Sequence, residues 1–155
     1  MQDLANDQIT VSIVMLKQAS THPWGSAVWS LLGLLPGLSE AELSLAQDKG
    51  DIHYFPDFSV QLHPLHSDSY YHNLMSGKPK IYVISPQEED TPQPFLVTVD
   101  YDEAASYMET GEQIFNAPLP SALCDWVEQF VLTHYQPEKP KKRRRKKWHD
   151  QAEKR

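Results

Sequence analysis

Hydrophobic and polar residues alternate in two extended segments of the first third of the chain. Residues 9–16 are rich in Ile and Val, and apolar side chains occupy every second position at the start of this segment. Period-two alternation with β-branched residues is typical of a strand that buries one face. Residues 24–35 form a second extended stretch, and Pro36-Gly37 is predicted to close it as a turn, because Pro fixes φ and Gly accepts positive φ.

Four further segments have the composition of short strands. They are residues 52–55, 58–65, 80–85 and 95–99, which are rich in β-branched and aromatic side chains. Pro56-Asp57 predicts a break between the first two, because Pro cannot donate to a ladder. Residues 86–94 hold three prolines and three consecutive acids and are predicted to form a surface loop.

Three short helices are predicted from polar residues that can cap the first turn and from glycines that can end the last. The signals are Ser39 with Glu42 around residues 40–47, Ser67 before residues 68–76 with Gly77 after them, and Asp100 with Glu103 before a helix that Gly111 ends.

A longer helix follows residue 121, where apolar side chains recur with the helical period. They are Leu123, Trp126, Val127, Phe130 and Val131. These offsets define one buried face, and Pro137 ends the helix. Because strands and helices do not alternate as βαβ units would, we predict an α+β fold, with a mainly antiparallel sheet and two C-terminal helices packed on one face.

Charge divides the 155-residue chain into two parts. Residues 139–155 hold ten of the 14 Lys and Arg residues and two acids, a formal charge of +8, whereas residues 1–138 hold four lysines and 19 carboxylates, a formal charge of −15. We therefore predict one α+β domain over residues 1–138 and a basic, disordered tail over residues 139–155, because like charges repel and no apolar period continues there.

Composition narrows the class of protein. Residues 1–8 carry no basic residue, which is not the pattern of a secretory signal, and the most apolar stretch, residues 27–38, is too short to span a bilayer. The single cysteine, Cys124, excludes an internal disulfide and multi-cysteine metal sites. These features favour a cytoplasmic location.

Four histidines lie within residues 53–72 and are candidates for metal ligands. His63 and His66, with His53 and His72 nearby, invite a metal site, but positions 63 and 66 of a strand face opposite sides unless the chain bends at Pro64. We therefore predict structural histidines and no metal.

Cys124 and His134 lie ten residues apart on the predicted helix, about 15 Å along its axis, too far to form a nucleophile–base pair. Cys124 is predicted to be a half-buried apolar residue. Paired carboxylates are explained as caps and solvated faces, and no glycine-rich phosphate loop is present, so the sequence predicts no catalytic residue.

The basic tail is the strongest candidate for binding. Its core is Lys141, Lys142, Arg143, Arg144, Arg145, Lys146 and Lys147, followed by Trp148. Such a segment binds a polyanion, an acidic groove of a protein partner, or the acidic body itself. Trp24 and Trp29 are further candidates, because residues five apart on a strand face opposite sides and one of the two can be exposed to a partner.

Residues 22–147 resemble a proteobacterial family of unknown function whose genes typically lie beside those of respiratory formate dehydrogenase and its accessory proteins. The residues that carry the resemblance are His22, Pro23 and Trp24 with Trp29; Leu35, Pro36 and Gly37; the strand 60–65; Asn73, Leu74, Pro79, Tyr82 and Val83; Val97, Thr98, Glu103, Ala104, Gly111 and Glu112; Pro118, Leu119 and Pro120; and Trp126, Val127, Phe130, Val131 and His134 before the basic tail.

The resemblance implies a role in the maturation or support of a molybdenum- or tungsten-containing formate dehydrogenase. Members are often labelled molybdopterin-guanine dinucleotide biosynthesis protein A, yet such a nucleotidyltransferase needs a glycine-rich loop after its first strand, and residues 16–20 contain no glycine. We therefore predict a non-enzymatic accessory protein without a cofactor, which binds a formate dehydrogenase subunit or its maturation factors. The alternatives are a molybdenum-cofactor-handling protein or small enzyme, and a nucleic-acid-binding protein that uses the tail.

Overall fold

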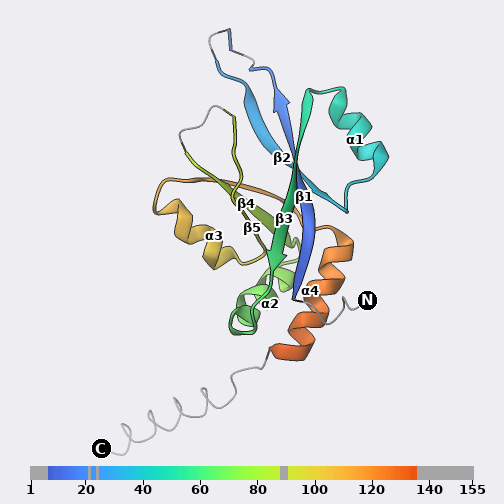
Figure 1. Ribbon diagram of the computed structural model, residues 1–155, viewed down its shortest axis with the longest axis vertical. Coiled ribbons are helices and arrows are strands. Elements are labelled where there is room, and N and C mark those ends of the chain that lie inside the picture. Colours follow the sequence, from blue (N-terminus) through green and yellow to red (C-terminus); the bar gives the residue numbers. More distant parts are fainter. Residues whose placement is uncertain (1–6, 21, 24, 88–90, 136–155) are drawn as a thin grey trace, which may run out of the picture.

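The computed structural model describes residues 7–20, 22–23, 25–87 and 91–135, which form two three-stranded antiparallel sheets and four α-helices (Figure 1). The predicted α+β class is confirmed. The basic segment 139–155 and Trp24 lie outside the described residues, so the predicted tail and the domain boundary at residue 138 stay predictions.

The first sheet has β1 (Gln8–Gln18) at its centre, between β2 (Val28–Leu35) and β3 (Asp51–Gln61). Both strands predicted in the first third of the chain are confirmed. Ile13 and Met15 of β1 share one face and are fully buried in the core, because alternate residues of a strand face the same side of a sheet. Val14 on the opposite face is fully buried as well, so β1 buries both faces at its centre.

β3 continues through Pro56-Asp57, so the predicted break is wrong. The ladder between β1 and β3 pairs Val11 with Phe58 and Ile13 with Phe55, which leaves one residue of β1 opposite two of β3. Asp57 adopts a positive φ of 67° at this irregularity. A β-bulge therefore absorbs the proline without ending the strand. The strand stops at Gln61, before the residue 65 that we predicted.

The second sheet has β4 (Lys80–Ser85) at its centre, between β5 (Leu96–Thr98) and β6 (Gln113–Pro118). β4 and β5 confirm the strands predicted over residues 80–85 and 95–99. β6 was not predicted, because Asn116, Ala117 and Pro118 disfavour strands. It forms at the edge of the sheet, where a proline is tolerated.

The two sheets share one hydrophobic core. β2 lies beside β6 and β3 beside β5, and the inner faces of both sheets contribute to a single cluster of buried side chains. Ile13 of β1, Ile81 and Val83 of β4, and Leu123 belong to this cluster, and each is at most 1% exposed. Burial of apolar surface in this cluster therefore holds the two sheets together.

The long C-terminal helix, α4 (Ser121–His134), buries the face that its sequence predicts. Leu123, Val127, Phe130 and Val131 are buried, and Trp126 is half-buried against the core. α4 packs against α2 (Ser67–Met75). Of the helices in the described ranges, none is long and apolar enough to cross a membrane.

The predicted placement of two C-terminal helices on one face of a sheet is not confirmed. α3 (Tyr101–Met108) contacts β4, β5 and β6, whereas α4 packs against α2. Figure 1 shows α3 and α4 on different sides of the strands. Hydrophobic periodicity identifies a buried helical face but not the surface that covers it.

Two of the predicted helix starts have different outcomes. α1 (Glu40–Gln47) has the predicted capping box, in which the Glu42 N–H donates to Ser39 Oγ and the Ser39 N–H donates to Glu42 Oε1. Ser67 is not the cap of α2. It lies inside the helix, after the 3₁₀ turn η2 (Pro64–His66), and its hydroxyl donates to the Pro64 carbonyl at 2.7 Å.

Candidate functional site

A groove with a volume of about 380 Å³ opens between α2, β4 and the first turn of α3. One wall is α2, which contributes Asp68, Ser69, His72 and Asn73, and Ser76 follows as the C-cap of this helix. Sites for small molecules have volumes of roughly 300–1,000 Å³. The groove therefore has the size of a small-ligand site, and we treat it as the candidate functional site.

β4 and α3 bring two tyrosines to the groove. Lys80 and Tyr82 project from the same face of β4, because they are two residues apart, while Ile81 faces the core. The ring of Tyr101, from the first turn of α3, lies 5.8 Å from the Tyr82 ring at an interplanar angle of 62°. Burial, and secondarily Tyr101, raise the pKa of Tyr82 above its ordinary value, so its hydroxyl is a neutral hydrogen-bonding group.

Charges of both signs line the groove. Lys78 and Lys80 supply two of the four lysines found in residues 1–138. Asp68 and Asp102 supply carboxylates, and Asp68 Oδ1 lies 3.3 Å from Nε2 of His72. The groove therefore combines cationic, anionic and aromatic groups.

Asn73 joins the helical wall to the strand. Its amide nitrogen donates to the carbonyls of Lys80 at 2.9 Å and Val99 at 3.0 Å, and its amide oxygen accepts from the Lys80 N–H at 3.0 Å. The side chain uses three of its four hydrogen-bonding positions in this way. Asn73 therefore fixes the end of α2 against the start of β4, which sets the position of Lys80 in the groove.

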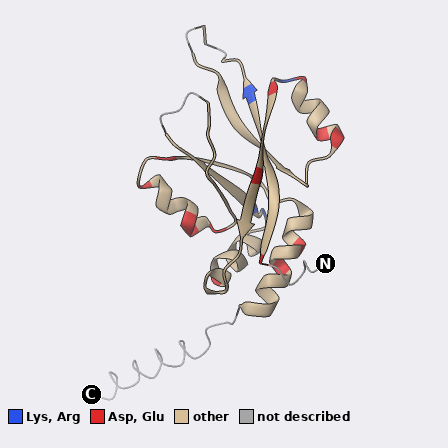
Figure 2. Ribbon diagram, viewed as in Figure 1, with Lys and Arg blue, Asp and Glu red and all other residues tan. Residues whose placement is uncertain are grey.

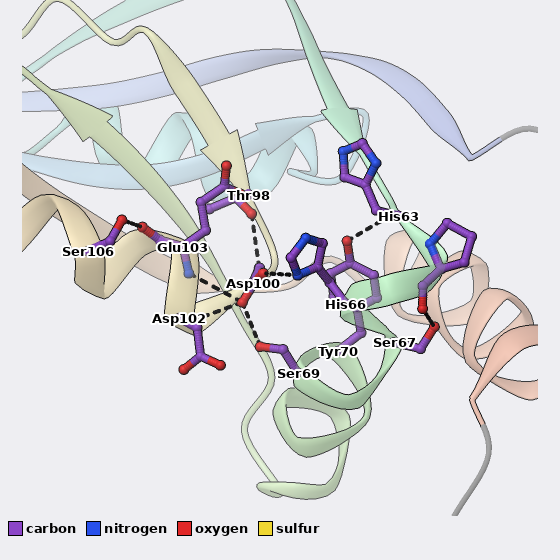
Figure 3. A network of polar contacts seen from close by, with 11 residues as sticks. His63, His66, Ser67, Ser69, Tyr70, Thr98, Asp100, Asp102, Glu103 and Ser106 are labelled. Carbon is purple, nitrogen blue, oxygen red and sulfur yellow. Dashed lines mark hydrogen bonds and ion pairs between the residues drawn. The ribbon is translucent and has the colours of Figure 1, made fainter.

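Asp100 makes a second polar connection, between the first turn of α2 and the first turn of α3 (Figure 3). Asp100 is buried, with 4% of its surface exposed. Its Oδ1 accepts hydrogen bonds from the Ser69 hydroxyl at 2.6 Å and from the backbone N–H groups of Asp102 at 2.9 Å and Glu103 at 3.3 Å. The predicted N-cap of α3 is thus confirmed, and the same carboxylate holds α2 to α3.

Ser69, Asp100 and His66 include the residue types of a catalytic triad but lie in a different order. Nδ1 of His66 is 3.5 Å from Oδ2 of Asp100, and Figure 3 shows the carboxylate between the serine and the imidazole. Activation of a serine nucleophile needs the imidazole between the hydroxyl and the carboxylate. We therefore assign this cluster a structural role.

Tyr70 lies next to this cluster in the core and is 2% exposed. Its phenolic oxygen accepts from the backbone N–H of His63 at 2.9 Å. Burial raises the pKa of Tyr70 to about 12, and the negative charges of Asp100 and Glu103 add to this effect. Tyr70 therefore stays protonated at neutral pH and acts as a fixed hydrogen-bonding group.

Of the contact residues predicted from the sequence, Trp29 lies in the described ranges, and it does not line the groove. Residues 141–148 and Trp24 lie outside the described residues. Trp29 is half-buried, its ring lies 4.7 Å from the ring of His53, and Nζ of Lys17 lies 5.7 Å from its ring centroid. Trp29 therefore already packs within the protein.

The histidines that invited a metal site lie in separate surroundings. The bend that starts at Pro64 brings the rings of His63 and His66 to 5.8 Å, whereas His53 contacts Trp29 and His72 contacts Asp68. In the part of the chain that the structure describes, no three His, Cys, Asp or Glu residues are grouped to hold a metal ion.

Cys124 is half-buried against the core, as predicted. Its sulfur lies 3.6 Å from the carbonyl oxygen of Leu119. Burial raises the pKa of the thiol, and the nearby charges of Asp125 and Glu128 add to this effect. The thiol form is favoured, so Cys124 is a poor nucleophile.

The groove was missed by the sequence analysis. A signal was available, because Lys80 and Tyr82 alternate on a predicted strand and Lys78 precedes them in a segment otherwise poor in basic residues. The opposite wall comes from α2 and α3, whose approach to β4 depends on tertiary packing.

The fold and the groove define a small acidic α+β protein with a ligand-sized surface site. The chain belongs to the family described as "Protein of unknown function (DUF3305)", whose model matches residues 10–145. No curated protein and no solved structure matches the chain.

Proposed function

We propose that the protein is a non-enzymatic accessory protein that binds a formate dehydrogenase subunit or one of its maturation factors. The observation that carries this proposal is the separation of charge, +8 in residues 139–155 against −15 in residues 1–138. The formate dehydrogenase context comes from the family resemblance described in the sequence analysis. In this proposal the basic tail is a docking arm and the folded body presents the remaining contact surface.

The acidity of the described surface favours a protein partner over nucleic acid. Among the carboxylates in the described ranges, Asp100 is buried and Glu112 is half-buried, while the others are exposed. Figure 2 shows acidic positions on α1, β3, α3 and α4. A long polyanion such as nucleic acid would meet this anionic surface as well as the cationic tail, and the two effects oppose each other.

A protein partner with an acidic recess avoids this conflict, because only the tail needs to enter it. Screening limits such contacts to short range, since the Debye length is about 8 Å at physiological ionic strength. The tail can therefore be attracted by a recess while the acidic body remains outside it. This arrangement makes the binding dependent on salt concentration.

The test is affinity purification from anaerobic, formate-exposed cells with two forms of the protein. One is the whole chain, and the other has the same length but carries serine at residues 141–147. We expect the whole chain to retain a formate dehydrogenase subunit or maturation factor and the serine form to lose most of it. Deletion of the gene should lower formate dehydrogenase activity and cofactor loading.

Other outcomes assign other functions. Equal recovery by both forms would move the contact to the folded body. Co-elution of nucleic acid or a pterin dinucleotide without a protein would identify the tail as a polyanion site. Unchanged formate dehydrogenase activity and cofactor loading after deletion would remove the accessory role.

A further inference from the structure

We propose that the groove between α2, β4 and α3 binds a small organic anion that carries one aromatic ring. The ring would lie against Tyr82 and Tyr101, and the anionic group, a phosphate or a carboxylate, would lie between Lys78 and Lys80. This inference does not rest on the proposed protein partner, because it is argued from described residues of the folded body and not from the basic tail.

The tyrosine pair carries the aromatic part of the proposal. Tyr101 is 50% exposed and Tyr82 is half-buried, and both line the groove. Their interplanar angle of 62° makes a corner rather than a parallel stack. A planar ring can stack on one face of such a corner and meet the edge of the other ring, the two arrangements that aromatic quadrupoles favour.

The two lysines carry the anionic part. The ion pairs of the described residues join His66 to Asp100 and His72 to Asp68, so no described carboxylate neutralises the ammonium of Lys78 or Lys80. Elsewhere in residues 1–138 the lysines are Lys17 and Lys49, which do not line the groove. Two of the four lysines of this acidic body therefore line one ligand-sized space.

The backbones of both lysines are held in place before a ligand binds. Asn73 bonds both the N–H and the carbonyl of Lys80, and the N–H of Lys78 donates to Ser76 Oγ at 3.2 Å. Ser76 in turn donates to the Asn73 carbonyl at 2.7 Å. Because the backbone is already ordered, binding needs to order only the lysine side chains, which lowers the entropic cost.

The carboxylates of the groove restrict the ligand. Asp68 and Asp102 are exposed lining residues, and Asp68 is paired with His72. Their negative charges repel a ligand with several anionic groups. Their carboxylate oxygens can accept hydrogen bonds from N–H or O–H groups on a ring. The favoured chemistry is an aromatic ring with hydrogen-bond donors and a single phosphate or carboxylate.

The test uses the full chain, isotope-labelled, with chemical shifts followed by NMR during titration. Phenyl phosphate and benzoate are the ring-bearing probes, and they distinguish a phosphate from a carboxylate. Inorganic phosphate and phenol, which are the two halves of phenyl phosphate, serve as control ligands. We expect one ring-bearing probe to bind with a millimolar dissociation constant, to shift resonances of α2, β4 and the start of α3, and to bind more tightly than either half.

Substitutions separate the groove from the tail. Lys78→Gln and Lys80→Gln should each weaken the ring-bearing probe about tenfold, because a hydrogen bond to a charged group is lost. Lys49→Gln removes the same charge outside the groove and should leave binding unchanged. Tyr101→Ser, at an exposed position, should remove the preference for the ring-bearing probe over inorganic phosphate.

Three results would overturn the proposal. The first is the absence of groove shifts with both ring-bearing probes at millimolar concentration. The second is equal weakening by Lys49→Gln and the groove variants, which would show a general charge effect. The third is inorganic phosphate binding as tightly as phenyl phosphate with shifts confined to the basic tail.

Discussion

Replacement of Asp100 by Ala tests whether one carboxylate joins α2 to α3. The side chain is buried and accepts three hydrogen bonds through Oδ1, one from Ser69 of α2 and two from backbone N–H groups in the first turn of α3. The alanine removes all three at once.

The expected loss follows from the individual contacts. Removal of an N-cap costs about 1 kcal/mol, and loss of a buried hydrogen bond to an ionised group costs about 1.5–3 kcal/mol. The contact with His66, whose side chain is 54% exposed, adds little because solvent screens it. We therefore expect Asp100→Ala to lower the free energy of unfolding by about 3 kcal/mol.

Urea unfolding, followed by far-ultraviolet circular dichroism and tryptophan fluorescence, measures this loss. Asp100→Asn should cost less than Asp100→Ala, because Asn caps a helix as well as Asp does. It should still lower the stability, because its amide cannot offer the Ser69 hydroxyl a charged acceptor. Ser69→Ala and the double variant complete a cycle, in which we expect a coupling of about 1–2 kcal/mol between residues in direct contact. Ser39→Ala, at the exposed cap of α1, is the matched control and should cost about 1 kcal/mol.

The reasoning is refuted if Asp100→Ala costs no more than Ser39→Ala. That result would mean that the buried contacts to Ser69 contribute nothing beyond an ordinary cap. Independent costs for Asp100→Ala and Ser69→Ala, with no coupling, would show that the two helices are not joined through this pair.

Three further predictions use other parts of the core. Leu123→Ala, at a 1% exposed position of α4, should cost about 2–5 kcal/mol in urea unfolding, whereas Leu132→Ala, 70% exposed on the same helix, should change stability by less than about 0.5 kcal/mol; similar costs would contradict the assigned face. Burial raises the pKa of Tyr70 from an ordinary value of 10.0 to about 12, so the unfolded chain releases the phenolic proton at lower pH than the folded protein. The stability that the neutral phenol contributes is therefore fully present below pH 10 and falls as the pH rises towards 12. Tyr70→Phe should make this fall in the free energy of unfolding less steep, and an unchanged slope would contradict the raised pKa. Cys124, whose pKa burial raises, should react with iodoacetamide at pH 8 more slowly in the folded protein than in urea, and equal rates would show an accessible thiolate.

The sequence predicted most helices and strands, because the residues that determine them lie close together in the chain. The α4 face, the α1 capping box and the Asp100 cap depend on residues within one or two helical turns of each other. The structure confirms all three. The positive φ of 87° at Gly77 likewise confirms the predicted end of α2, because that conformation favours glycine.

The failures have causes that lie far along the chain. Pro56 suggested a break, yet the partner strand β1 continues its ladder on both sides of the bulge. β6 has weak propensity and forms because β4 offers an unpaired edge, with Tyr82 opposite Asn116. Ser67 resembled a cap, but the 3₁₀ turn η2 already begins at Pro64, and the Ser67 hydroxyl donates to the Pro64 carbonyl.

The groove could not be predicted either, because it depends on contacts between residues that are far apart in the chain. Asn73 reaches Val99, 26 residues away, and Ser69 reaches Asp100, 31 residues away. Both contacts cross between α2 and the segment that joins β5 to α3. Without them Lys78 and Lys80 would be isolated surface charges and Tyr101 an ordinary residue in a first helical turn. Because these polar contacts at both ends hold α2 in place, substitution of Asn73 or Asp100 should disturb the groove even though the lysines and tyrosines remain.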